Sequence, residues 1–188
     1  MAPPPSEIIP VTVADAQREM RFAYYGGAPG MLVSAAVWTV AGCVALARPP
    51  DRAIGTLFVG GMLIHPVSLG FLKLLGRPAK HRAENPFGSL ALATTLGMIL
   101  ALPLAYGVSR VRIEWFFPAM LCIIGGRYLS FATMFGDRTY WFCGTALAVA
   151  GLGLATVYAS PVAGAFTGAA IEAGFAVLIA RGARVETD

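Results

Sequence analysis

Residues 87–108 read FGSLALATTLGMILALPLAYGV, and no charged side chain interrupts them. A helix rises 1.5 Å per residue, so this stretch would extend for about 33 Å, enough to cross a hydrocarbon core about 30 Å thick. It starts directly after Asn85 and Pro86, a capping residue and the proline typical of a first helical position. The stretch therefore predicts a membrane-spanning helix.

Five further stretches have the same apolar character. They lie at residues 29–47, 53–75, 113–135, 139–158 and 160–180. Hydrophobic residues make up 57% of the chain and charged residues only 13%, whereas a soluble domain carries about 25% charged residues. We therefore predict an all-α, polytopic membrane protein, with a bundle of six transmembrane helices at residues 28–181.

The two ends of the chain are expected to lie outside this bundle. Residues 1–27 are predicted to form an N-terminal tail and a short interfacial helix, which the capping-box pattern at Thr12 begins. A glycine-rich run at residues 26–30 is expected to be a hinge at the membrane boundary. Residues 182–188 are predicted to form a short C-terminal tail.

The basic residues predict the orientation. One side of the predicted bundle carries Arg18, Arg21, Lys73, Arg77, Lys80, Arg82, Arg138, Arg181 and Arg184, and the other carries Arg48, Arg52, Arg110 and Arg112. Because cytoplasmic loops are enriched in Lys and Arg, we expect both termini in the cytoplasm. Arg77, Lys80 and Arg82 are also candidate contacts to anionic lipid headgroups.

Three polar residues lie midway along predicted membrane helices: His65, Arg127 and Glu172. A charged group at that depth costs about 2.5 to 3.5 kcal/mol on insertion scales, so such groups usually pair or line a pathway. In the predicted topology their three helices run in the same direction, which places all three residues near the bilayer midplane. Transporters usually bind their substrates at that level.

The neighbours of these residues fit a packed interior. Pro66 is expected to kink the helix beside His65. Tyr128 and Ser130 add hydroxyl groups near Arg127. The candidate helix-packing glycines are Gly125 and Gly126 before Arg127, and Gly164 and Gly168, which share a helical face with Glu172.

Two interpretations of the cluster remain open. In the first, Arg127 attracts an anionic group, Glu172 is its counter-ion or proton acceptor, and His65 is a titratable neighbour along a solute pathway that also includes Tyr128 and Ser130. This favours a transporter or channel for a small anionic solute of unknown identity. In the second, Arg127 and Glu172 form a buried structural ion pair in a non-catalytic scaffold or accessory subunit.

Other functional classes find little support in the sequence. Cys43, Cys122 and Cys143 lie in three separate apolar segments without metal-binding spacing, so we expect no metal and no cofactor. No catalytic motif is recognisable, which makes an intramembrane enzyme the weakest hypothesis. The basic residues lie in loops, so we expect the lipid bilayer as partner rather than nucleic acid. Glycine-rich and alanine-rich helix faces are also compatible with a homo-oligomer.

Several short motifs resemble those of a bacterial family. They are GGAPG at residues 26–30, IHP at 64–66, KLLGRP at 73–78, NP at 85–86, WFFPA at 115–119 and GGRYLSF at 125–131. The chain is similar, over residues 15–180, to a bacterial family of small uncharacterised multi-pass membrane proteins, a domain of unknown function. This resemblance implies a bacterial inner-membrane location and supplies no activity, substrate or cofactor.

Overall fold

Apolar helices make up nearly all of the chain that the computed structural model describes, residues 12–185. The outer parts of the two predicted tails, residues 1–11 and 186–188, lie outside the described residues. The long helices are α2 (Ala28–Ala47), α3 (Pro50–Leu74), α4 (Phe87–Val111), α5 (Phe116–Phe135), α6 (Thr139–Thr156) and α7 (Pro161–Val185). Six helices, α2 among them, are long and apolar enough to cross a membrane, which confirms the predicted all-α, multi-pass membrane fold.

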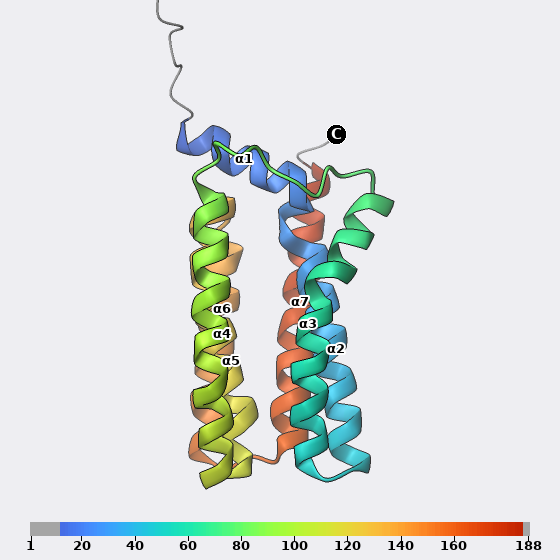
Figure 1. The fold of residues 1–188 in the computed structure, drawn as a ribbon, viewed down its shortest axis with the longest axis vertical. Helices are drawn as coiled ribbons and strands as arrows, with labels where there is room; N and C mark the ends of the chain where they lie inside the picture. Colours follow the sequence, from blue (N-terminus) through green and yellow to red (C-terminus); the bar gives the residue numbers. More distant parts are fainter. Residues whose placement is uncertain (1–11, 186–188) are drawn as a thin grey trace, which may run out of the picture.

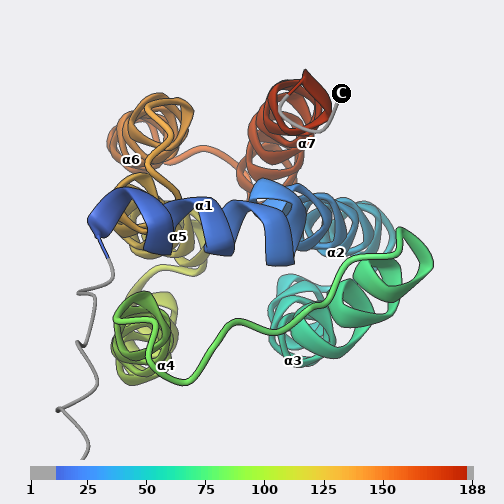
Figure 2. The same ribbon diagram turned by 90° about the horizontal axis from the view of Figure 1, so that it is seen from above.

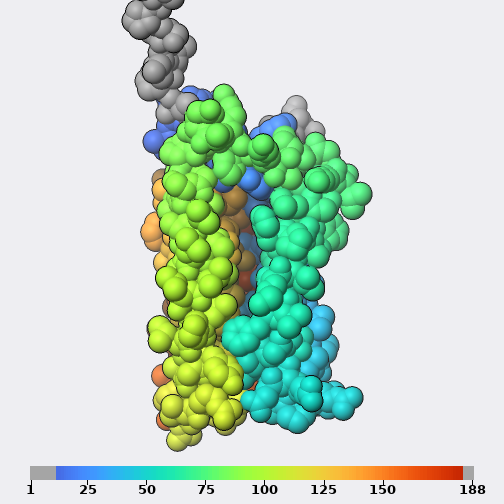
Figure 3. Space-filling view, viewed as in Figure 1, coloured from blue at the N-terminus to red at the C-terminus, as the bar shows by residue number. Residues whose placement is uncertain are grey.

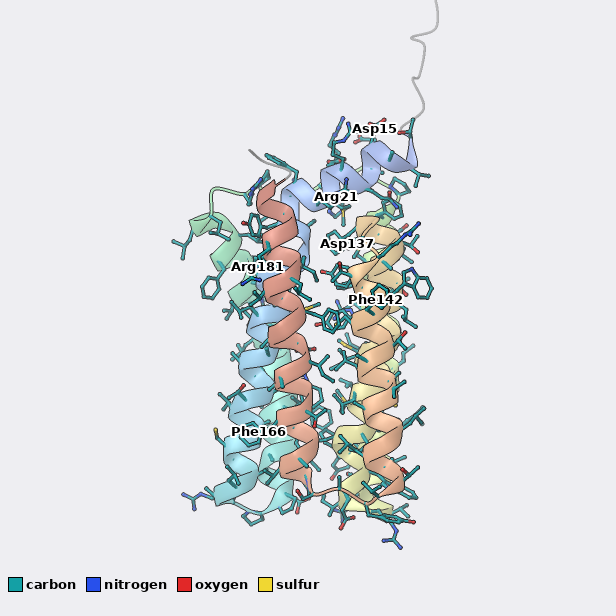
Figure 4. All side chains as sticks on the ribbon, turned by 180° about the vertical axis from the view of Figure 1, so that it is seen from behind. Asp15, Arg21, Asp137, Phe142, Phe166 and Arg181 are labelled. Atoms are coloured by element: carbon teal, nitrogen blue, oxygen red, sulfur yellow. The ribbon has the colours of Figure 1, made fainter. Side chains whose placement is uncertain are left out.

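The six helices form two rows of three. One row contains α3, α2 and α7, and the other contains α4, α5 and α6 (Figure 2). Packing within the rows is extensive for α5 with α6 and for α2 with both α7 and α3, whereas only α6 and α5 make substantial contacts with α7 across the rows. Apolar side chains such as Phe142 project outward from the bundle, as a lipid environment requires (Figure 4).

Glycines allow close helix packing within and between the rows. A Cβ atom on Gly125 of α5 would lie 2.7 Å from the carbonyl oxygen of Gly144 in α6. Gly168 of α7 lies against the ring of Trp38 in α2, and Gly164 lies against Phe117 of α5. The predicted small-residue face of the last helix therefore does contact protein.

The short helix α1 (Val13–Tyr24) lies across one end of the bundle (Figure 1). The Thr12 side chain caps it by accepting a hydrogen bond from the backbone N–H of Asp15 (3.1 Å). Two α1 side chains also donate hydrogen bonds to backbone carbonyl groups in the last turn of α5, where helical partners are missing. Gln17 donates to the Thr133 carbonyl (2.7 Å) and Arg21 to the Phe135 carbonyl (2.6 Å).

The chain turns from α1 into α2 through the short 3-10 helix η1 (Tyr25–Gly27). All three of its residues have positive φ angles, 50° at Tyr25, 63° at Gly26 and 88° at Gly27. Glycine adopts such angles without steric cost, so the glycine pair allows the sharp change of direction that the sequence predicts here.

Residues 76–86 connect α3 to α4 and run along α1. The Glu19 carboxylate accepts hydrogen bonds from the backbone N–H of Arg82 (2.6 Å) and from the Asn85 side chain (3.0 Å). Tyr24 and His81 form a third hydrogen bond (2.8 Å). The hydrogen bond from the Arg82 backbone N–H is the main reason why the pKa of the Glu19 carboxyl group is lowered. The ionised carboxylate therefore stabilises the contact of residues 76–86 with α1.

Helices α3 and α4 diverge toward the α1 end. Pro66 interrupts the hydrogen bonding of α3, and the part of α3 beyond it tilts away from α4 (Figure 1). At the opposite end, the Phe58 ring of α3 contacts Tyr106 of α4 and Phe116 of α5, with centroid distances of 6.5 and 5.3 Å. Between these two ends the surface is hollowed along the line between α3 and α4 (Figure 3). We call this hollow the lateral opening.

Candidate functional site

Arg127 extends from α5 toward α4. Its Nη2 donates a hydrogen bond to the Thr95 hydroxyl (3.0 Å), and its Nη1 lies 3.5 Å from the sulfur of Met98, a weak acceptor. The guanidinium carbon lies 5.1 Å from the centroid of the Phe131 ring. The buried Nε has no hydrogen-bond partner among the described residues. All of these contacts to the Arg127 cation therefore come from uncharged groups.

Glu172 lies in a separate environment between α7, α5 and α2. Its side chain is fully buried, and Oε1 accepts a hydrogen bond from the Tyr128 hydroxyl (3.0 Å). The hydroxyl of Ser34 also interacts with the carboxyl group, whereas Oε2 accepts no hydrogen bond of standard geometry. A carboxyl group in this setting depends on hydroxyl donors, since burial without a partner is costly.

The direct ion pair of the second interpretation is not formed, because no Arg127 nitrogen lies within 4.0 Å of a Glu172 oxygen in the described structure. The physical reason is helix geometry. Arg127 and Tyr128 are consecutive in α5 and point about 100° apart, so one reaches α4 and the other reaches α7. The structure thus joins Tyr128 to Glu172 and leaves Arg127 to Thr95, although the two charges remain near enough to interact electrostatically.

Helical register directs Arg127 and His65 toward the same space. Arg127 follows Phe116 by eleven residues, three turns along one face of α5, and His65 follows Phe58 by seven residues, two turns along one face of α3. Phe116 and Phe58 are in contact. We conclude that Arg127 and His65 face the region between α3 and the row that contains α4 and α5.

The remaining predicted pathway residues make fewer contacts. The His65 side chain is exposed and makes no hydrogen bond with a described residue, and its backbone carbonyl accepts one from the Ser68 hydroxyl (2.8 Å). Ser130 is partly buried and its hydroxyl makes no hydrogen bond with a described residue. Gly126 is exposed with open space beside it, so within one chain it does not provide the expected helix packing.

A family profile matches residues 13–182, from the start of α1 almost to the end of α7. The chain belongs to DUF7010, a family of unknown function. This confirms the resemblance to an uncharacterised family. No curated protein and no solved structure matches the chain.

Sequence reasoning missed three residues that contact the two charged groups. Thr95 and Met98 hold the Arg127 guanidinium, and Ser34 lies beside Glu172. Hydroxyl residues in the middle of otherwise apolar segments could have identified Thr95 and Ser34, because such groups need a partner in a membrane interior. No comparable signal distinguishes Met98 from the other apolar residues of its helix.

The three candidate lipid contacts differ in their surroundings. Arg77 lies 5.0 Å from the ring centroids of both Phe22 and Tyr25, and Arg82 pairs with Glu19 (3.4 Å) while its side chain remains 75% exposed. Lys80 is exposed. Contact with lipid headgroups remains a prediction for these residues, with Lys80 and Arg82 the more accessible.

The described residues contain no group of three or more His, Cys, Asp or Glu side chains that could hold a metal ion. Cys43 is exposed, Cys122 is partly buried and Cys143 is buried, each on a different helix.

Proposed function

We propose that this multi-pass membrane protein is a transporter or channel for a small anionic solute, with Arg127 as the cation that attracts it. We further propose a bacterial inner-membrane location with both termini in the cytoplasm, which the distribution of Lys and Arg supports.

The observation that carries the proposal is that the Arg127 guanidinium has no ion-pair partner among the described residues. This guanidinium lies in the middle of a candidate membrane span, contacts a hydroxyl, a thioether and an aromatic ring, and has no carboxylate within 4.0 Å among the described residues. A cation at such a depth requires compensation. An anionic solute would supply both the missing charge and acceptors for the guanidinium.

A structural role is the second candidate function, and it is favoured by one observation. The hydrogen bond between Tyr128 and the fully buried Glu172 joins α5 in one row to α7 in the other. A scaffold would need such a contact between the rows. It would not need an Arg127 without a direct ion-pair partner, and this is why we prefer transport.

Anion flux into reconstituted vesicles tests the proposal. Phosphatidylcholine vesicles with and without the full chain would receive potassium chloride, phosphate or methanesulfonate, with valinomycin as the potassium carrier, and swelling would be followed by light scattering. We expect the wild type to accelerate uptake of at least one anion, and we expect Arg127→Gln to abolish this while Arg127→Lys retains part of it.

The matched control is Arg110→Gln, which removes an exposed arginine from the end of α4. It should leave the flux unchanged. Uptake no faster than in protein-free vesicles for every anion, or equal uptake by the wild type and Arg127→Gln, would contradict the proposal.

A further inference from the structure

The lateral opening offers a route to Arg127 from the side of the molecule. In the space-filling view, atoms of the later, orange to red helices are visible behind the gap between α3 and α4 (Figure 3). Each of these two helices packs mainly on one neighbour, α3 on α2 and α4 on α5, and they scarcely contact each other. Arg127 and His65 face this region by helical register.

Both ends of this region are covered. At the α1 end, residues 76–86 cross from α3 to α4 and are hydrogen-bonded to α1 through Glu19 and Tyr24. At the other end, the rings of Phe58, Tyr106 and Phe116 close the space between α3, α4 and α5. Access from the bilayer is therefore more direct than access from either aqueous side.

The surface around the lateral opening is apolar. Met62 lies four residues after Phe58 on the same face of α3, and Ile99 and Leu92 lie seven and fourteen residues before Tyr106 on the same face of α4; all three side chains are exposed. Such a surface suits the hydrocarbon chain of a lipid-like molecule. Arg127, which lies behind it, suits a carboxylate, phosphate or sulfonate group.

We infer, building on the proposed role of Arg127 as an anion-binding residue, that the site also binds amphiphilic anions with a long hydrocarbon chain, which enter from the bilayer through the lateral opening. The charged group of such an anion binds the Arg127 guanidinium beside Thr95, and its chain stays between α3 and α4 or in the surrounding lipid. The contacts to Met98 and Thr95 use one N–H on each terminal nitrogen of Arg127, so the second N–H on each of these nitrogens is a donor for that charged group.

Spin-label spectroscopy in phosphatidylcholine vesicles tests this inference. The probe is stearic acid with a nitroxide on its chain, used at about pH 9, where a carboxyl group is ionised. The control probe is its methyl ester, which has the same chain without the charge. We expect the full-length wild type to immobilise a larger fraction of the acid than of the ester, by about threefold or more.

Competition and variants identify the site. Hexadecanesulfonate should displace the immobilised acid, whereas methanesulfonate, which has the same charged group without the chain, should not at equal concentration. Arg127→Gln should remove the preference for the acid, Arg127→Lys should retain part of it, and Arg110→Gln should leave it unchanged. Thr95→Val is a second variant that weakens the hold on Arg127 without deleting the charge, and it should reduce the preference.

The outcomes separate this inference from the proposed function. Equal displacement by methanesulfonate, or equal immobilisation of acid and ester, would overturn the inference, and the proposed function would still stand if Arg127-dependent methanesulfonate flux were observed. Absence of both the flux and the preference for the acid would overturn both. Unchanged immobilisation in Arg127→Gln and in Thr95→Val would place the binding elsewhere and would also overturn the inference.

Discussion

Two consecutive residues of α5 have different surroundings, and this difference determines the chemistry of the interior. Tyr128 donates a hydrogen bond to Glu172, while Arg127 contacts Thr95 and Met98 of α4. The hydrogen bond between Tyr128 and Glu172 is buried, whereas the Nε donor of Arg127 has no acceptor among the described residues. These surroundings support the proposal that Tyr128 and Glu172 have a structural role and that Arg127 has a binding role.

The structural role can be tested with Tyr128→Phe. Loss of the hydroxyl leaves a buried carboxyl oxygen without its donor, and we expect the free energy of unfolding to fall by about 1 to 3 kcal/mol. Unfolding of the full chain in detergent, followed by tryptophan fluorescence, would measure it. Tyr106→Phe is the control, because Tyr106 is exposed and its hydroxyl makes no hydrogen bond with a described residue. Equal effects of the two substitutions would argue against this structural role.

At this scale the sequence identified the charged residues but not their partners. The free-energy cost of a charge in the membrane interior identified Arg127 and Glu172 from their positions in apolar sequence alone. It could not say which neighbouring helix each side chain reaches, because a rotation of 100° about one helix separates Arg127 from Tyr128. The ion pair of one of the two interpretations is therefore not formed, and Tyr128 links α5 to Glu172 instead.

At the scale of the helices, the close contact between α5 and α6 depends on glycine residues, which have no side chain. Gly125 and Gly144 bring the two backbones together, so a methyl group on Gly125 would meet a carbonyl oxygen at 2.7 Å. The neighbouring Gly126 has open space beside it. Both α5 and α6 also pack against α7, so a shift of either helix would disturb a second contact.

This pair of glycines provides a matched test. We expect Gly125→Ala to lower the free energy of unfolding by about 1 to 3 kcal/mol, because backbone atoms must move apart. Gly126→Ala should be neutral or raise it by up to about 1 kcal/mol, since alanine favours a helix over glycine. Unfolding in detergent would compare the two variants. A larger loss with Gly126→Ala would contradict the described packing.

The docking of residues 76–86 on α1 should depend on pH through Glu19. Hydrogen bonds lower its pKa below the usual value of 4.5, so the stabilisation is complete above that value and is lost as the pH falls through the lower, folded-state pKa. Hydrogen-exchange protection of the Arg82 amide, corrected for intrinsic rates, should therefore decrease in acid. Glu19→Gln should remove this dependence and Glu84→Gln, in the same loop, should not. A pH-independent protection factor in the wild type would contradict this mechanism.

The sequence predicts helix ends better than helix arrangement. Thr12, Asn85 and Ser160 mark the starts of α1, α4 and α7, and each side chain accepts a hydrogen bond from a backbone N–H of the first turn. Pro66 also predicted the kink in α3. Its direction, away from α4, and the division into two rows depend on packing between distant segments, which no local pattern encodes.

Across the whole molecule, the two rows are connected by few contacts. The Tyr128–Glu172 hydrogen bond is one of them, and α1 with residues 76–86 spans one end of both rows (Figure 1). Such an arrangement leaves α3 and α4 apart and keeps Arg127 accessible from the side. A direct ion pair between Arg127 and Glu172 would instead use that charge to hold the rows together.

A double-mutant cycle on Arg127→Gln and Glu172→Gln distinguishes these arrangements most directly. The free energy of unfolding would be measured in detergent for the wild type, both single variants and the double variant. We expect a coupling energy below about 1 kcal/mol, because the two groups share no contact within 4.0 Å. A coupling of about 3 kcal/mol or more, as for a buried ion pair, would contradict an Arg127 available to a ligand.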